Sequence, residues 1–365
     1  MILLQTLFST KNKRLKEEQH ILVIRFSAMG DIAMTVPIIY SLSYQYPKTK
    51  ITIVSKPFAN TFFCTMPPNV KFIGVDLKHK YKGVKGLYNL FKFLYQIHPT
   101  AIADLHDVLR TKFLRLCFRI KGIKVAHINK HKQGKRNLCK KHHKILKQQP
   151  TSFSNYIDVI KKIGYNITPI FNSIYQNSNT TTIIADNNLP IKTKNEIWVG
   201  IAPFAAHKWK TYPVNKMKNA IKILIERNPQ IKIFLFGGGA KEEEILENWS
   251  NEYHNCINVP SITNGLNQEL LLMSELNLMI SMDSANMHLA SLVNTRVLSI
   301  WGATHPYCGF LGWKQNKNDT IQNKDLKCRP CSVFGNKTCY RGDFACMESI
   351  NANMLVDEIE SRLYK

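Results

Sequence analysis

The residues best suited to chemistry lie between Asp283 and His288, in the segment DSANMH. A short apolar run at 278–282 precedes them and predicts a buried strand of a parallel sheet. Asp283 and Ser284 then stand where a helix should begin, and a second strand is expected at 296–300. Ligands bind at the carboxyl edge of such sheets, and a helix N-terminus attracts phosphate. A structural interpretation explains the spacing equally well: Asp283 caps the helix and His288 is a satisfied core histidine.

A second candidate site contains Gly30 and Asp31. The apolar segment 20–26 predicts the first strand, and residues 27–31 follow it as a loop. The next helix should begin beside Pro37, because proline is tolerated only in a first turn. This βαβ opening places Asp31 at the carboxyl edge of the first sheet, although a helix cap would explain it as well. With its single glycine the loop is not a GxGxxG fingerprint, which argues against an NAD enzyme.

The 365 residues are enough for two α/β domains, each with its own core. Strands and helices alternate in both halves, and this predicts two open α/β domains with parallel sheets facing a central cleft. An Asn-, Thr- and Ser-rich segment separates them. The predicted parts are an N-terminal extension (1–19), a first domain (20–171), a linker (172–195), a second domain (196–350) and an amphipathic C-terminal helix (351–365).

Charge predicts anionic partners. The chain has 50 Lys and Arg against 25 Asp and Glu, a net charge of +25, and residues 110–147 hold 14 basic residues and no acidic one. Such a segment favours nucleic acid, acidic phospholipid or a phosphorylated saccharide. No run approaches the length of a membrane span, and charges follow the short apolar N-terminus, so we expect a cytoplasmic protein.

Four late cysteines, Cys328, Cys331, Cys339 and Cys346, have the spacing C-x2-C-x7-C-x6-C. The first pair has the spacing of a zinc knuckle, so a structural zinc site is one hypothesis. Reduced, metal-free thiols are the alternative, and we expect no cofactor to be required.

Four segments together resemble glycosyltransferase family 9, the ADP-heptose:lipopolysaccharide heptosyltransferases. They are RFSAMGDI (25–32), KTYP (210–213), DSANMH (283–288) and GATHP (302–306). The resemblance extends over the chain from His20 onward. It implies the GT-B fold, with two Rossmann-like domains, nucleotide-sugar in the second and acceptor in the first. It also implies transfer of heptose, with inversion, from ADP-heptose to a Kdo or heptose of the lipopolysaccharide inner core.

The resemblance also implies roles for individual residues. Asp31 matches the catalytic carboxylate, and Lys210, with Lys208 as a neighbouring alternative, matches a lysine on the donor phosphates. Glu242 corresponds to a carboxylate near the nucleoside. The donor element would contain Ala205, Ala206, Asp283, Ser284, Ala285 and His288. Without the resemblance, Lys210 would be an ordinary surface lysine and Glu242 an exposed first-turn residue.

Acceptor contacts are expected from Gly30, His106 and Arg110. Alternatively, His106 and Arg110 belong to a charged surface that only contacts solvent. The acceptor would be an anionic lipopolysaccharide precursor, and the protein would act as a peripheral protein on the cytoplasmic face of the inner membrane. We expect no nucleic acid partner.

Three alanines depart from the family pattern. Ala205 and Ala206 stand where hydroxyl residues are common, and Ala285 stands where glycine is usual. They motivate a rival hypothesis, a related transferase that uses another nucleotide-sugar. A second rival, motivated by the basic segment, is a non-catalytic protein that binds polyanions or membranes on the same fold.

Overall fold

The computed structural model describes residues 19–364, so the predicted extension, apart from Gln19, and Lys365 lie outside the described range. The described chain forms two compact units. The first unit consists of residues up to 27, 39–128 and 156–169; the second consists of residues 28–38, 129–155 and 170 onward.

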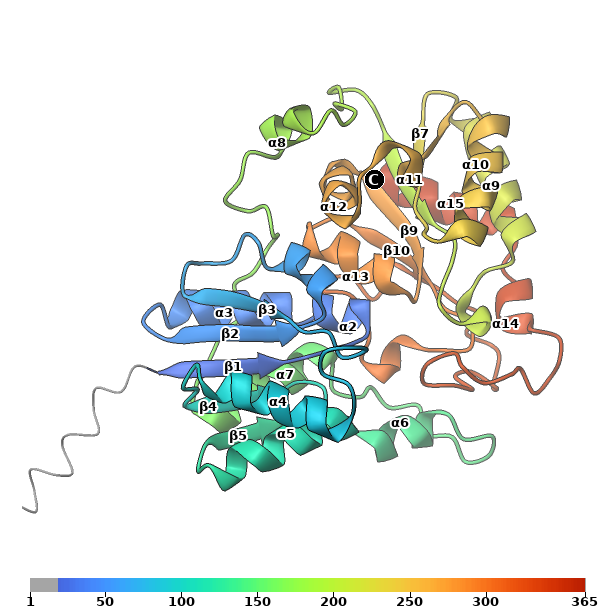
Figure 1. Cartoon of the computed structure of the whole chain (residues 1–365). Coiled ribbons are helices and arrows are strands. Elements are labelled where there is room, and N and C mark those ends of the chain that lie inside the picture. The colour runs from blue at the N-terminus through green and yellow to red at the C-terminus, as the bar shows by residue number, and fades with distance from the viewer. Residues whose placement is uncertain (1–18, 365) are drawn as a thin grey trace, which may run out of the picture. The chain divides into compact units, whose positions relative to one another are not determined.

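A five-stranded parallel sheet forms the first unit, in the order β3-β2-β1-β4-β5 (Figure 1). Its strands are β1 (His20–Ile24), β2 (Lys50–Ser55), β3 (Val70–Gly74), β4 (Ala101–Asp104) and β5 (Lys124–His127). Its helices are α3 (Val36–Gln45), η2 (Pro57–Phe62), α4 (Gly83–Tyr95), α5 (Leu109–Ile120) and α7 (Ser152–Ile163), of which α3 and α7 each have one end in the second unit. The central strand β1 is buried from Ile21 to Ile24, as expected for a parallel strand covered on both faces.

A six-stranded parallel sheet forms the second unit, in the order β11-β10-β9-β6-β7-β8. Its strands are β6 (Trp198–Ala202), β7 (Lys232–Leu235), β8 (Cys256–Asn258), β9 (Leu278–Met282), β10 (Val297–Ile300) and β11 (Thr320–Ile321). The helices between the strands are η3 (Lys208–Lys210), α9 (Val214–Arg227), α10 (Ala240–Glu252), α11 (Val259–Ile262), α12 (Leu266–Glu275), α13 (Ala285–Leu292) and η4 (Pro306–Cys308). The remaining helices are α2 (Met29–Ala33), α6 (Lys132–Leu138), α8 (Thr180–Asp186), α14 (Ala345–Glu348) and α15 (Ala352–Leu363).

The two parallel sheets confirm the predicted fold class. The structure has helices or strands that the sequence analysis did not predict in three places. Residues 27–31 were expected to be a loop, but α2 begins at Met29. The segment 172–195, expected to be a linker, contains α8, which packs on α12 and buries Ile184. The basic segment contains β5 and α6 in addition to loops. None of the helices in residues 19–364 is long and apolar enough to cross a membrane.

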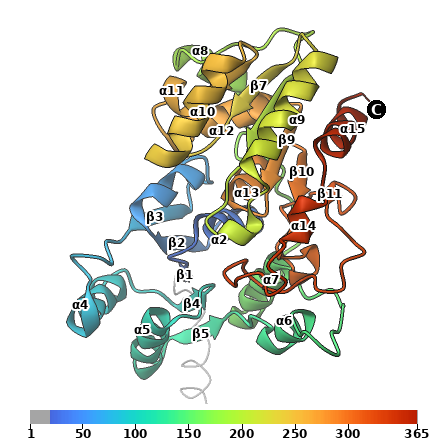
Figure 2. The ribbon, with the colours of Figure 1, turned by 90° about the vertical axis from the view of Figure 1, so that its right-hand side faces the viewer.

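The predicted C-terminal helix is α15. Asn351 caps it by accepting a hydrogen bond from the Met354 amide at 2.7 Å. Its apolar side, Leu355, Val356 and Ile359, is buried, and α15 lies beside α9 (Figure 2). The helix therefore completes the core of the second unit.

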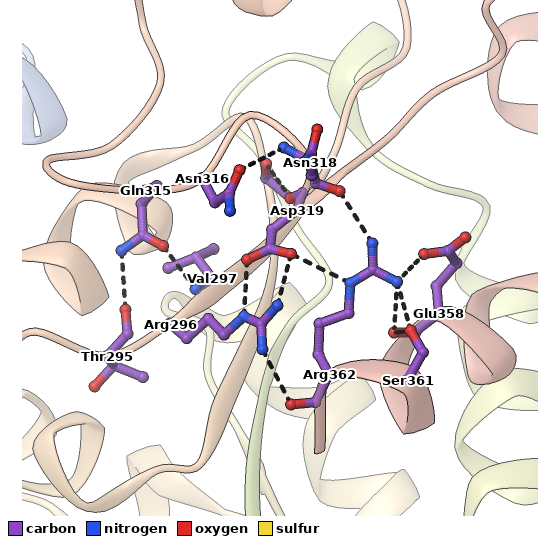
Figure 3. Close-up of polar contacts among 11 residues, drawn as sticks. Thr295, Arg296, Val297, Gln315, Asn316, Asn318, Asp319, Glu358, Ser361 and Arg362 are labelled. Atoms are coloured by element: carbon purple, nitrogen blue, oxygen red, sulfur yellow. Dashed lines mark hydrogen bonds and ion pairs between the residues drawn. The ribbon is translucent and has the colours of Figure 1, made fainter. Parts of the chain in front are cut away.

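A buried carboxylate, Asp319, ties α15 to the edge of the sheet (Figure 3). Arg296 donates to it through Nε at 2.8 Å and Nη2 at 3.0 Å, and Arg362 of α15 donates through Nε at 3.2 Å. Arg362 also contacts the Glu358 carboxylate. Burial alone raises the pKa of Asp319, but the hydrogen bonds from Arg296 and Arg362 outweigh it, so that the pKa lies below its usual value.

Replacing Asp319 with Asn should destabilise the protein by about 3 kcal/mol, because two arginines lose their shared buried partner. The lowered pKa means that this stabilisation is complete above the pKa of the unfolded chain, near about 4, and is lost as the pH falls further. Thermal unfolding at neutral and acid pH measures both effects. Asp357→Asn is the control: Asp357 of α15 makes an exposed pair with Arg227 of α9, and its loss should cost less than about 1 kcal/mol. Equal losses in the two variants would show that Asp319 does not anchor α15.

Candidate functional site

A cavity of about 510 Å³ lies in the second unit, at the carboxyl edge of its sheet. The cavity brings together most of the predicted site residues, namely Gly30, Asp31, Ala205, Ala206, Lys210, Glu242, Asp283, Ser284, Ala285 and His288. Its other lining residues are Ala28, Met29, Met34, Phe204, His207, Asn286, Phe310, Val333 and Phe334. The structure thus gathers three separate sequence motifs around one space.

Strand pairing explains how two of these motifs meet. β6 and β9 are parallel neighbours, with Ala202 opposite Ser281. The loop after β6 and the turn after β9 therefore leave the sheet at the same edge. The first carries Lys210 and the second carries Asp283.

An ion pair joins these two segments. Lys210 Nζ lies 2.9 Å from Asp283 Oδ2, and the two side chains are 16% and 4% exposed. The structural interpretation of Asp283 as a helix cap is wrong, because Ser284 occupies the N-cap position of α13 and no side chain caps this helix. Within residues 19–364, the first-turn N–H groups of α13 thus have no side-chain acceptor, which suits an anion.

His288, one turn into α13, is a neutral base. Burial lowers its pKa to about 4, with Asp283 and Asp31 opposing this effect and Lys210 reinforcing it. Its Nδ1 atom is buried without a hydrogen-bond partner among the described residues. The alternative of a satisfied core histidine is therefore wrong. A buried, unpartnered ring nitrogen beside a cavity can bind a ligand group.

Asp31 lies on α2, which packs against α13. Its Oδ2 atom accepts a hydrogen bond from the Ala28 amide at 3.2 Å, so the capping role and the position at the cavity coexist in one residue. Gly30 permits this close packing: a Cβ atom there would lie 2.6 Å from Cδ2 of His288. The Gly-Asp pair thus brings a carboxylate close to the α13 histidine.

Glu242 shapes the glycine-rich turn after β7. Its Oε2 atom accepts from the Gly238 amide at 3.0 Å, and the neighbouring Glu243 accepts from Gly239 at 2.9 Å. Gly239 has a positive φ of 93°, which favours glycine. Glu242 therefore lines the cavity and is more than an exposed first-turn residue.

A loop at residues 328–336 forms a further wall of the cavity. Arg329 anchors it: this residue is 4% exposed, and its guanidinium donates to the carbonyl oxygens of Trp301 (2.8 Å), Gly302 (2.6 Å) and Asn323 (2.6 Å). Burial lowers the pKa of Arg329 to about 10. A buried guanidinium satisfied by carbonyl groups fixes the loop relative to the end of β10.

Gly335 of this loop packs against the methylene chain of Lys210. A Cβ atom at Gly335 would lie 2.2 Å from Cγ of Lys210, and its φ of +72° also favours glycine. The loop therefore limits where the Lys210 ammonium can go, and it holds the side chain close to Asp283.

The sequence did not point to the aromatic wall of the cavity. Phe310 and Phe334 stack with ring centroids 5.8 Å apart, and Lys135 Nζ lies 4.1 Å from the Phe310 centroid. Neither phenylalanine belongs to a motif or to a periodic element. Only the fold brings their loops together.

Three predicted residues are not in the cavity. Lys208 is exposed, with Nζ 5.3 Å from the Trp209 ring. His106 and Arg110 belong to the first unit. His106 is 8% exposed; its Nδ1 accepts from the Phe26 amide at 3.4 Å and its Nε2 lies 3.2 Å from Ser27 Oγ. Arg110 is exposed on α5.

The four late cysteines lie in the second unit, between β11 and α15. Cys328, Cys331 and Cys339 are half-buried and Cys346 is buried, all as free thiols. Burial raises the pKa of Cys346 to about 12. Across residues 19–364, no three His, Cys, Asp or Glu side chains form a group that could hold a metal ion.

Comparison with known proteins decides the family. The model of glycosyltransferase family 9 (heptosyltransferase) matches residues 90–339, more than half of the chain. The chain belongs to this family.

Relatives of this glycosyltransferase match it over most of its length. Lipooligosaccharide heptosyltransferase 2 of Campylobacter jejuni is 24% identical over 342 residues, which are 91% of this chain and 95% of that protein. The same-named protein of Haemophilus influenzae is 24% identical over 304 residues, 79% of this chain and 84% of that one. The structure of E. coli heptosyltransferase WaaC with ADP matches with a TM-score of 0.64 at 16% identity, covering 94% of this chain and all of that one. The fold is GT-B, and the chain is an enzyme.

Replacing Gly335 with Ala should displace the Lys210 side chain from Asp283 and expose its amine. We expect acylation of Lys210 by a water-soluble succinimidyl ester, followed by peptide mass spectrometry, to become several times faster. Gly342→Ala is the matched control, because Gly342 has a similar φ of +81° but nothing lies within 4 Å of its added Cβ. Both variants carry backbone strain of about 1 kcal/mol, and only the first meets Lys210. Equal Lys210 reactivity in both would show that Gly335 does not position it.

Proposed function

We propose that this enzyme transfers heptose from ADP-heptose, with inversion, to the Kdo or heptose inner core of lipopolysaccharide. One observation carries the proposal: a carboxylate (Asp31), a partly buried cation (Lys210) and an uncapped helix N-terminus (α13) line the same cavity. A displacement at a sugar carbon needs a proton acceptor on one side and stabilisation of a departing diphosphate on the other. The names of the relatives support the sugar and the pathway.

In the proposed reaction the acceptor hydroxyl attacks C1 of the heptose. Its oxygen forms the new glycosidic bond while Asp31 takes its proton. The bond from C1 to the β-phosphate oxygen breaks, and its electron pair leaves with ADP. Attack from the face opposite to the leaving group inverts the configuration at C1.

Lys210 and the first turn of α13 would stabilise the charge that gathers on the departing diphosphate. A partly buried cation such as Lys210 is more effective there than a fully exposed one, because less water screens it. Neutral His288 would add a hydrogen-bonding nitrogen without a further positive charge. Glu242, at the glycine-rich turn, would contact the nucleoside.

Within the proposal the acceptor is an anionic lipopolysaccharide precursor at the cytoplasmic face of the inner membrane. The basic segment 110–147 supports an anionic, membrane-anchored acceptor. Exposed Arg110 and the cluster around His106 would contribute to its binding from the first unit.

A different nucleotide-sugar donor is the alternative. Ala205, Ala206 and Ala285 present methyl groups to the cavity, so fewer hydroxyl groups are available to the donor than the family pattern suggests. A donor screen by thermal shift separates the two: stabilisation by ADP-heptose alone favours the proposal, and stabilisation by another nucleotide-sugar alone favours the alternative.

Asp31→Asn should lower the kcat of acceptor-dependent ADP release by about 100-fold to 10,000-fold, because it removes the proton acceptor but keeps the shape of the side chain. The assay uses ADP-heptose and a truncated lipid A–Kdo acceptor. ADP affinity should change little, and Asp158→Asn, at an exposed carboxylate of α7, should retain full activity. If Asp31→Asn released ADP as fast as wild type, the proposed transfer reaction would stand, but Asp31 would be excluded as its base.

A further inference from the structure

The outer side of α5 is apolar, although it faces solvent. Leu109, Leu116 and Ile120 are 84%, 58% and 75% exposed. Their spacings of seven and four residues place them on one side of the helix. The opposite side, with Leu114 and Phe118, is buried in the core. Packing within the first unit therefore does not account for the exposed stripe.

The neighbouring helix α4 continues this apolar area. Val84, Tyr88 and Tyr95, at spacings of four and seven residues, are 70%, 46% and 37% exposed. The two helices pack side by side, with the Phe91 and Phe118 rings 5.0 Å apart between them. Lys121, which ends α5, has its Nζ 5.9 Å from the ring of Tyr95. We call these six exposed apolar residues and their cationic neighbours the α4–α5 face.

The charges of this face have a single sign. Its exposed cations are Lys85, Lys92, Arg110, Lys112, Arg119 and Lys121. The sequence has no acidic residue at 77–103 or at 108–157. Of the two carboxylates between these ranges, Asp104 is buried and Asp107 pairs with Arg115 at 3.0 Å. The face therefore combines aromatic and aliphatic side chains with uncompensated positive charge.

We propose that the α4–α5 face docks on an anionic lipid bilayer. Apolar side chains flanked by Lys and Arg are the composition of interfacial membrane-binding helices, and tyrosines suit the headgroup level. A second copy of this chain fits less well, because a symmetric dimer would bring like charges together. The inference deepens the proposed function, because it names the part of the chain that meets the lipid.

Vesicle sedimentation with the full chain tests the proposal. Wild type should bind vesicles that contain phosphatidylglycerol, should bind phosphatidylcholine vesicles weakly, and should bind less at high salt. Leu116→Ser with Ile120→Ser should weaken binding by about tenfold, since two inserted side chains are lost. Lys112→Gln with Arg119→Gln should weaken it by about fivefold for each charge removed. All four side chains are exposed, so the variants should keep the wild-type melting temperature.

The matched control is Ile145→Ser with Leu146→Ser, two exposed apolar residues in the basic segment outside this face. Vesicle binding that is lost in the α5 variants and kept in this control supports the proposal. Binding that survives in the α5 variants, or is lost equally in the control, overturns it. The proposal is also overturned if wild type binds no vesicles but forms a dimer, and the α5 variants are monomers.

The outcome is separable from that of the proposed transfer reaction. With a soluble, deacylated acceptor the α5 variants should transfer as wild type does, whereas with acceptor embedded in vesicles their rate should fall in parallel with vesicle binding. Vesicle binding without any transfer would refute the proposed reaction and leave the docking face in place. Transfer without vesicle binding would refute the docking face and leave the proposed reaction in place.

Discussion

The candidate site depends on the ion pair between Lys210 and Asp283. Taking two charges out of water is costly, and a pair of this kind often contributes little to folding stability. In this site the pair holds the Lys210 ammonium at the edge of the sheet, largely removed from water. Asp283 pairs with the ammonium, and Gly335 packs against the methylene chain of Lys210. A diphosphate that approached it would replace Asp283 as the partner of a positioned charge. Such preorganisation favours binding of a developing negative charge.

The other groups of the cavity are arranged around this pair. α13 begins directly after Asp283 and presents uncapped N–H groups and neutral His288 on the same side. α2 packs on α13 at Gly30 and adds the Asp31 carboxylate. The loop at residues 328–336, which Arg329 anchors, forms a further wall of the cavity. The fold thus gathers a carboxylate, a cation and a helix N-terminus around one cavity, although the three come from distant parts of the sequence.

Much of this site follows from local sequence signals. The apolar run at 278–282 predicted β9, and the position of polar residues at strand ends predicted which edge of the sheet carries the site. The roles of Asp31 and Lys210 came only from resemblance to a family, because a lone Asp or Lys after a strand has no distinguishing local pattern. Only the tertiary structure shows that these two residues line the same cavity.

Other features lay beyond the reach of local patterns. Phe310, Phe334 and Gly335 sit in irregular loops whose course is set by Arg329, a residue that sequence alone marks as an ordinary surface cation. The short helices α2 and α8 were missed because their few turns form against α13 and α12, and tertiary packing, not propensity, stabilises elements of this length. β5, only four residues long, was obscured by the surrounding positive charge.

The most direct test of the central claim is calorimetric titration of ADP into wild type, Lys210→Met and Lys208→Met. If the Lys210–Asp283 pair supplies the phosphate-binding charge, Lys210→Met should weaken ADP binding by about tenfold to 100-fold, the effect of losing one charged hydrogen bond. Adenosine binding should stay unchanged. Lys208→Met, at the exposed neighbouring lysine, should bind ADP as wild type does. Full ADP affinity in Lys210→Met, or a loss confined to Lys208→Met, would contradict a phosphate-binding role for the Lys210–Asp283 pair.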